Sequence, residues 1–252
     1  MTRDRQAVSA LAGLVVVVII IAAAFYVTIP MVATSSTTSS PVTTSPSTNT
    51  STTSGPSTGT LTISTKQPLL VAPDVGESVT LKLTAIGTVS GNYTLSATSL
   101  PNGIKATFQP SSVSLPDQIS NPVTMTLSAA AGAAVGDSSI TVQASAGSSV
   151  FTSQLSLSSV AALVLIQGNA FVPSSVTVPA NTKVYWLNLD ANGGGDVNAL
   201  GHDVTASDGS FSSGNGNLHQ YDIFSFTFTK PGTVTYKSAA QPSMAGQVVV
   251  TG

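Results

Sequence analysis

Short runs in which apolar and hydroxyl side chains alternate fill the chain from residue 61 onward, and they restrict this part to β-structure. Val79–Ala85 reads Val-Thr-Leu-Lys-Leu-Thr-Ala, and Ile223–Phe228 reads Ile-Phe-Ser-Phe-Thr-Phe. A period of two places alternate side chains on opposite faces of a strand, and Val, Thr and Phe all favour strands. Gly, Pro, Asn and Asp separate the runs at intervals of about ten residues, a spacing typical of β-sandwiches. We therefore predict an all-β fold.

We expect two β-sandwich domains in series, over residues 61–160 and 161–252. Within the first, Leu100–Val113 and Ala134–Ala144 resemble the immunoglobulin-like modules of secreted microbial proteins. This domain has no histidine, no cluster of carboxylates and no nucleophile beside a base, and Lys105 and Asp117 are expected on solvated faces. The resemblance implies a spacer or binding module, not an enzyme.

The N-terminal region contains an apolar run from Ala7 to Ile29. About 20 such residues cross the hydrocarbon core of a bilayer as a helix. Arg3 and Arg5 precede the run, and no Asp, Glu, Lys or Arg follows until Lys66. Because positive flanks stay in the cytoplasm, we predict a cytoplasmic N-terminus over residues 1–6, a transmembrane helix over 7–31, and all later domains outside the cell.

Two alternatives compete with a simple anchor. Ala22–Ala24 supplies the small residues of a cleaved signal peptide, although the apolar run is long for one. Arg5-Gln-Ala-Val-Ser9 followed by a long aliphatic helix resembles the N-termini of archaeal type IV pilin-like proteins. That resemblance implies a subunit whose helix packs into a filament core.

Residues 32–60 are predicted to form a disordered Ser/Thr-rich linker. From Thr34 to Thr60, 20 of 27 residues are Ser or Thr, and such a segment buries too little apolar surface to offset the entropy of ordering. It is a candidate for O-glycosylation. Asn49-Thr-Ser and Asn92-Tyr-Thr are also candidate N-glycosylation sequons.

Composition excludes several functions. Charged residues make up 7% of the chain, the net charge is −2, and cysteine is absent. Without a basic field the chain is not expected to bind nucleic acid. Without cysteine it forms no disulfide, zinc–thiolate site or thiol nucleophile of its own.

The C-terminal domain carries a more specific pattern, and from Leu163 to Gly252 it resembles the cupredoxins, a Greek-key family of blue copper proteins. The resemblance rests on a Phe-x-Pro opening, Val-x-Trp-x-Asn, Gly-His-Asp-Val-Thr, Phe-Ser-Ser-Gly, Phe-Ser-Phe-Thr-Phe with Pro-Gly, and Met-x-Gly, at residues 171–173, 184–188, 201–205, 211–214, 224–232 and 244–246. Family members hold copper with two histidines, a cysteine and a weak axial methionine.

Only half of the implied ligand set is present. His202 and Met244 stand at the positions of the first histidine and the methionine, whereas Ser238 and Gln241 stand at those of the cysteine and the second histidine. A serine hydroxyl stays protonated near neutral pH and does not replace a thiolate. No resident cofactor is expected, and any copper bound would not form a type 1 centre.

A different metal site is conceivable. It would combine His202 and His219 with one of the nearby carboxylates, which belong to Asp190, Asp196, Asp203 and Asp208. The alternative is that His202 is a satisfied loop residue kept for packing and that His219 lies on the surface.

Together these features predict a single-pass cell-surface membrane protein of an archaeon or similar microbe, with a structural or binding role. Its expected partners are the membrane, other surface proteins or further copies of itself. The alternatives are a copper-binding or electron-transfer protein of the blue copper family and a pilin-like filament subunit. No motif joins a nucleophile, a base and an orienting group, so we do not expect an enzyme.

Overall fold

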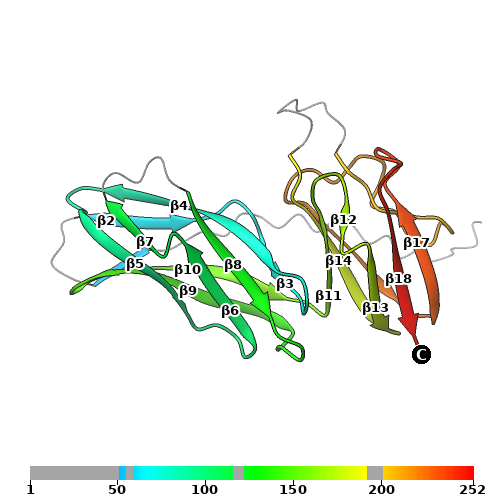
Figure 1. The fold of residues 1–252 in the computed structure, drawn as a ribbon, viewed down its shortest axis with the longest axis horizontal. Helices are drawn as coiled ribbons and strands as arrows, with labels where there is room; N and C mark the ends of the chain where they lie inside the picture. The colour runs from blue at the N-terminus through cyan, green and yellow to red at the C-terminus, as the bar shows by residue number, and fades with distance from the viewer. Residues whose placement is uncertain (1–50, 55–58, 116–121, 192–200) are drawn as a thin grey trace, which may run out of the picture. The chain divides into compact units, whose positions relative to one another are not determined.

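The computed structural model describes residues 51–54, 59–115, 122–191 and 201–252, and every regular element in these ranges is a β-strand (Figure 1). The predicted all-β class is confirmed. No helix long and apolar enough to cross a membrane occurs in these ranges. The predicted transmembrane or pilin-like helix, the sequon at Asn49, Asp117 and Asp196 lie outside the described residues.

The N-terminal sandwich comprises strands β1 to β10 and has two sheets. One sheet has the order β2–β4–β8–β6 and contains Thr60–Ser64, Glu77–Ile86, Val123–Ala129 and Ile104–Gln109. The other has the order β1–β10–β9–β5–β7, with β3 parallel to β10, and contains Ser51–Ser54, Ser149–Ser159, Gly136–Ala146, Gly91–Thr98, Ser112–Leu115 and, as β3, Leu69–Val71.

Alternation in sequence becomes alternation in burial in this sandwich. Along β4, every second side chain from Glu77 to Leu83 is buried and those between are exposed. The inward side chains of both sheets share one core, in which Leu81 and Met125 from one sheet and Val142 and Phe151 from the other are each 0% exposed. Burying each such side chain contributes about 1.5–3 kcal/mol.

Part of the predicted linker belongs to this fold. Ser51–Ser54 forms β1, which pairs antiparallel with Ser153–Val150 of β10. Strand pairing uses backbone N–H and C=O groups, so a hydroxyl-rich segment joins an open sheet edge without burying apolar side chains. Composition alone does not reveal such a strand.

The C-terminal sandwich comprises strands β11 to β18, also in two sheets. The first has the order β12–β11–β14–β16 and contains Phe171–Val172, Ala162–Ile166, Thr182–Asn188 and Ile223–Phe228. The second has the order β13–β18–β17–β15 and contains Ser175–Pro179, Ala245–Thr251, Gly232–Lys237 and Thr205–Ala206. β11 runs parallel to β14, and β13 runs parallel to β18, so each sheet is mixed.

The segment Phe171–Val178 contributes to both sheets of this sandwich. β12 ends at Val172 and β13 begins at Ser175, in the other sheet. Pro173 lies between them and has no N–H to donate to a ladder, which favours a break at this point.

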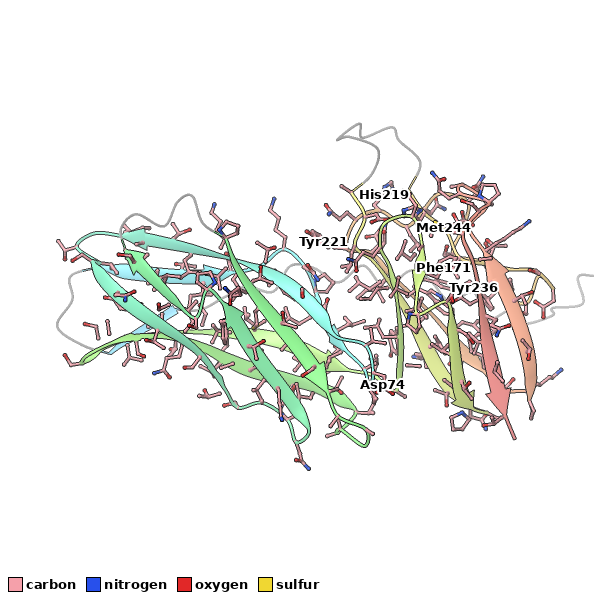
Figure 2. All side chains as sticks on the ribbon, viewed as in Figure 1. Asp74, Phe171, His219, Tyr221, Tyr236 and Met244 are labelled. Atoms are coloured by element: carbon pink, nitrogen blue, oxygen red, sulfur yellow. The ribbon has the colours of Figure 1, made fainter. Side chains whose placement is uncertain are left out.

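Aromatic side chains dominate the core of the C-terminal sandwich. Trp186 is 0% exposed, and its ring centroid lies 5.4 Å from that of Tyr236 and 5.6 Å from those of Phe211 and Phe224. Val184, two residues earlier on the same strand, is also buried. Figure 2 shows Phe171 beside Tyr236, with ring centroids 4.9 Å apart in an edge-to-face arrangement, a geometry that aromatic quadrupoles favour.

Candidate functional site

The Gly-His-Asp-Val-Thr segment, residues 201–205, leads into β15 and lies against Leu218. The His202 N–H donates to the Leu218 carbonyl over 3.0 Å, and the Leu218 N–H donates back to the His202 carbonyl over 2.9 Å. A Cβ atom at residue 201 would overlap the Leu218 carbonyl oxygen. Gly201 is therefore needed for the close approach of two backbone segments.

The His202 side chain is held by a carboxylate and is 7% exposed. Its Nε2 lies 3.0 Å from Oδ2 of Asp190. That carboxylate also accepts the N–H groups of Gly168 and Asn169, over 2.7 and 2.8 Å, so it is itself fixed in place. The other ring nitrogen, Nδ1, is buried and has no hydrogen-bond partner among the residues that the structure describes.

Asp203 is the most highly connected polar side chain of the site, and it is 0% exposed. Its Oδ1 accepts the Ser238 hydroxyl over 3.0 Å and the Ala240 N–H over 2.9 Å. Its Oδ2 accepts the Ala239 N–H over 3.0 Å and the Thr205 hydroxyl over 2.9 Å. Burial raises the pKa of the Asp203 carboxyl, but these four donors outweigh burial and hold the pKa below its usual value.

Ser238 stands where the resemblance places a copper-binding cysteine, and its hydroxyl is fully occupied. The hydroxyl proton is donated to Asp203, and Oγ accepts the N–H groups of Asp203 and Gln241 over 3.4 and 3.2 Å. A hydroxyl has one proton and two lone pairs. No bonding capacity is left at this oxygen for a metal.

The other two residues carried over from the resemblance have separate environments. The Gln241 side chain is exposed, whereas Met244 is 2% exposed and packs in the aromatic and aliphatic core. Backbone bonds from Ser238 N–H to the Met244 carbonyl (3.2 Å) and from Met244 N–H to the Gln241 carbonyl (2.9 Å) close the loop between them. Figure 2 shows Met244 at the same end of this sandwich as His219.

The alternative site built on both histidines is not assembled in the described part of the chain, where no three His, Cys, Asp or Glu side chains gather as metal ligands. His219 is exposed, and its N–H donates to Asp222 over 2.9 Å. Asp208 is exposed and accepts the Ser210 N–H over 2.9 Å.

These donors do not fit a type 1 copper centre. The chain has no cysteine, the Ser238 oxygen is saturated, and Gln241 points to solvent. Only His202 Nδ1 and the Met244 thioether keep the chemistry of copper ligands. The arrangement suits a hydrogen-bonded loop more than a metal centre.

The sequence predicted Ser238 at the cysteine position, but it indicated Asp203 only as a possible metal ligand and not as the partner of Ser238. It also gave no prediction for a buried acid in the N-terminal sandwich. Glu77 is 0% exposed; its carboxylate accepts the Gln67 side-chain amide over 2.9 Å and the Leu70 N–H over 2.7 Å. Burial, only partly offset by these two bonds, raises the pKa of Glu77 to about 8. A signal was present, since Glu77 shares the inward parity of Val79 and Leu81 on β4.

No protein-family model and no curated protein sequence matches this chain. Among solved structures, it is similar to a purple cupredoxin from Nitrosopumilus maritimus, with 22% identity and a TM-score of 0.30 over 36% of this chain and 99% of that one. Amicyanin from Paracoccus versutus shows 23% identity and a TM-score of 0.29 over 36% and 80%. A reduced amicyanin mutant shows 25% and 0.30 over 36% and 81%. With TM-scores this low, the similarities carry no argument about function.

Proposed function

We propose that this protein is a membrane-anchored cell-surface protein whose C-terminal sandwich is a cupredoxin-like scaffold without a type 1 copper centre, and that its role is structural or binding. The observation that carries the proposal is the saturated hydroxyl of Ser238. The atom at the thiolate position donates to one carboxylate and accepts two backbone N–H groups, so it is part of the fold.

The cupredoxin-like interpretation draws on sequence and topology together. The sandwich has two four-stranded sheets, each with one parallel strand pair. His202 lies in the segment before β15 and Ser238 follows β17, and the Asp203 N–H joins the two segments by donating to Ser238. The loop from Ser238 to Met244 directly follows β17. These are the positions at which the sequence pattern placed the ligand loop.

The cell-surface part of the proposal rests on the apolar run Ala7–Ile29, the preceding Arg3 and Arg5, and the hydroxyl-rich linker. A surface location is also compatible with the sequon at Asn92. Asn92 and Thr94 both have exposed side chains on β5, so a glycan at this asparagine would point away from the core.

One observation favours a second candidate, copper handling. Histidines that bind metals usually donate their other ring N–H to a carboxylate, and His202 has such a carboxylate in Asp190 at 3.0 Å. Its buried Nδ1 has no hydrogen-bond partner within the described part of the chain. With Met244 it would supply one imidazole and one thioether, a soft pair suited to weak Cu(I) binding.

Copper titration of the full-length chain in detergent separates the two candidates. We expect no one-to-one binding of Cu(II) by calorimetry, no intense thiolate-to-copper absorption, and no tight Cu(I) binding in competition with a chelator. A stoichiometric site that is lost in His202→Ala but kept in His219→Ala would overturn the scaffold proposal in favour of copper handling.

The location is tested on membranes from cells that express the full chain. We expect the protein to resist extraction with alkaline carbonate and to lose its C-terminal sandwich to protease added outside intact cells. Release by carbonate would overturn the anchor. Mass spectrometry of the mature N-terminus adds a further test, because a start within residues 6–10 would favour the filament subunit instead.

A further inference from the structure

We propose that strand β16 is an interaction surface through which two copies of this chain pair edge to edge, with the two strands antiparallel and Phe226 on the two-fold axis. The surface consists of residues 222–230 of the C-terminal sandwich. This inference goes beyond the proposed role by naming a surface and its partner, a second copy of the chain, and it does not depend on whether copper binds.

β16 is an open sheet edge. It is the last strand of its sheet, and no strand in the described residues pairs with its outer side. The other outer strands of this sandwich offer little to pair with, because β12 and β15 have two residues each and β13 ends at Pro179. β16 has six residues, with no charge and no proline among them. A strand edge of this kind is a template for pairing with another chain.

The backbone groups that point away from the sheet belong to alternate residues of β16. The Asp222 carbonyl accepts the Asn188 N–H over 3.0 Å, on the side of β14. The Phe228 carbonyl likewise accepts the Asn181 N–H over 2.6 Å. In an antiparallel strand the bonding side alternates from one residue to the next. The odd-numbered residues therefore present their N–H and C=O groups to the open edge, and these residues are Ile223, Ser225 and Thr227.

One antiparallel register suits the backbone, the aromatic side chains and the charges at the same time. It places Ser225 opposite Thr227 of the second copy, as a pair that exchanges two backbone hydrogen bonds. Phe226 then lies opposite its own counterpart, in a non-hydrogen-bonded pair, where side chains are closest. At both ends of the paired strands Asp222 lies opposite Lys230. Opposite charges that face one another across strands stabilise the pairing, and a shift of the register in either direction separates them.

The side chains of this edge are placed to make these contacts. Phe226 is only half-buried, although its ring lies against the core with its centroid 4.7 Å from that of Phe211. Lys230 is exposed. The Asp222 carboxylate accepts the His219 N–H over 2.9 Å, which fixes it just before the strand. The edge is thus self-complementary, as a two-fold dimer requires, since the same patch serves both subunits.

A single introduced cysteine tests the position of the axis, because the chain has no cysteine of its own. In the full-length chain in detergent, we expect Phe226→Cys to form a disulfide-linked dimer under mild oxidation. The Cα atoms of a non-hydrogen-bonded pair lie about 4.5 Å apart, within the range that a disulfide spans. Thr227→Cys is the matched control at the neighbouring exposed residue, whose two copies would lie out of register, and we expect it to stay mostly monomeric. No dimer from Phe226→Cys, or equal yields from the two variants, would overturn the proposal.

A second variant tests the charge pairs without altering the core, and it decides the question if Phe226→Cys fails to fold. Lys230→Glu places two acids opposite one another at each end of the paired strands. We expect it to raise the dimer dissociation constant of the full-length chain about tenfold, measured by sedimentation equilibrium in the same detergent. Lys237→Glu makes the same change at an exposed lysine of the other sheet and should leave this constant unaltered. Equal constants for the two variants, or a wild-type chain that stays monomeric at every concentration, would overturn the inference.

Discussion

The Ser238 hydroxyl donates a hydrogen bond to the Asp203 carboxylate over 3.0 Å, between residues 35 positions apart in the chain. Ser238 is the residue at which the sequence resemblance implies a copper-binding cysteine. A neutral donor and a charged acceptor form a bond about twice as strong as one between two neutral groups. This bond therefore ties the segment before β15 to the loop that follows β17.

Copper binding is expected to be restorable in steps. Ser238→Cys with Gln241→His returns the missing donors beside His202, and we expect Cu(II) to bind with an intense visible absorption that the wild-type chain lacks. Adding Asp203→Asn should tighten binding by at least ~10-fold, because a carboxylate this close opposes a second negative charge on the thiolate. Optical titration measures both effects. Equal affinity in the double and triple variants would show that the carboxylate does not oppose copper.

The stability of the N-terminal sandwich should depend on pH through Glu77. Its pKa is about 8 in the folded protein, against 4.5 ordinarily, so between these values the folded state holds a proton that the unfolded state releases. The free energy of unfolding then falls as pH rises from 4.5 to 8, by at most about 1.4 kcal/mol per pH unit, and levels off above that range.

Glu77→Gln should flatten this pH dependence, because the glutamine side chain does not titrate. Urea unfolding followed by circular dichroism between pH 5 and 9 provides the measurement. Asp137→Asn is the matched control, because it makes the same chemical change at an exposed carboxyl group. A wild-type chain with no loss of stability across this range would contradict the expectation.

Gly246 should be intolerant of any side chain. A Cβ there would lie 2.5 Å from the hydroxyl oxygen of Tyr236, a residue in the aromatic core, and overpacking of this kind costs about 1–3 kcal/mol. We expect Gly246→Ala to lower the melting temperature by several degrees. Gly76→Ala is the matched control, because its nearest non-neighbour atom would be 3.7 Å away. Equal effects of the two substitutions would argue against the close contact.

The single tryptophan offers a probe of the C-terminal sandwich. Trp186 is 0% exposed, so its fluorescence should shift to longer wavelength when this sandwich unfolds. Phe211→Ala removes a ring 5.6 Å from Trp186 and should cost about 3–5 kcal/mol. Phe226→Ala, at a half-buried position, should cost less. A larger loss of stability in Phe226→Ala than in Phe211→Ala would contradict the expectation.

The strands were largely predictable from sequence, because alternation is a local property. The Ile223–Phe228 run coincides with β16, and the Val79–Ala85 run lies within β4. Ser51–Ser54 was not predictable as a strand, because its pairing with β10 depends on an open sheet edge and not on its own side chains.

For the candidate site, the sequence predicted only which copper ligands are missing. The resemblance to the cupredoxin ligand loop assigned Ser238 and Gln241 to the cysteine and histidine positions. Asp203, in contrast, was one of four aspartates near His202 in the chain, with nothing in the sequence to distinguish it. Its partners become visible only when the register of β15 on β17 is known. Glu77 could have been found by parity alone, since an acid in line with inward Val and Leu side chains must be buried.

The pairing of His202 with Asp190 also links the segment after β14 to the segment before β15. Asp190 Oδ2 and His202 Nε2 are 3.0 Å apart although their residues are 12 positions apart in the chain, and Asn188 and Gly201 are bonded to Leu218 and Gly216, respectively. Each of the two segments thus also has bonds of its own to the rest of the fold. His202→Ala would therefore leave the Asp190 carboxylate with its two backbone donors alone, the N–H groups of Gly168 and Asn169.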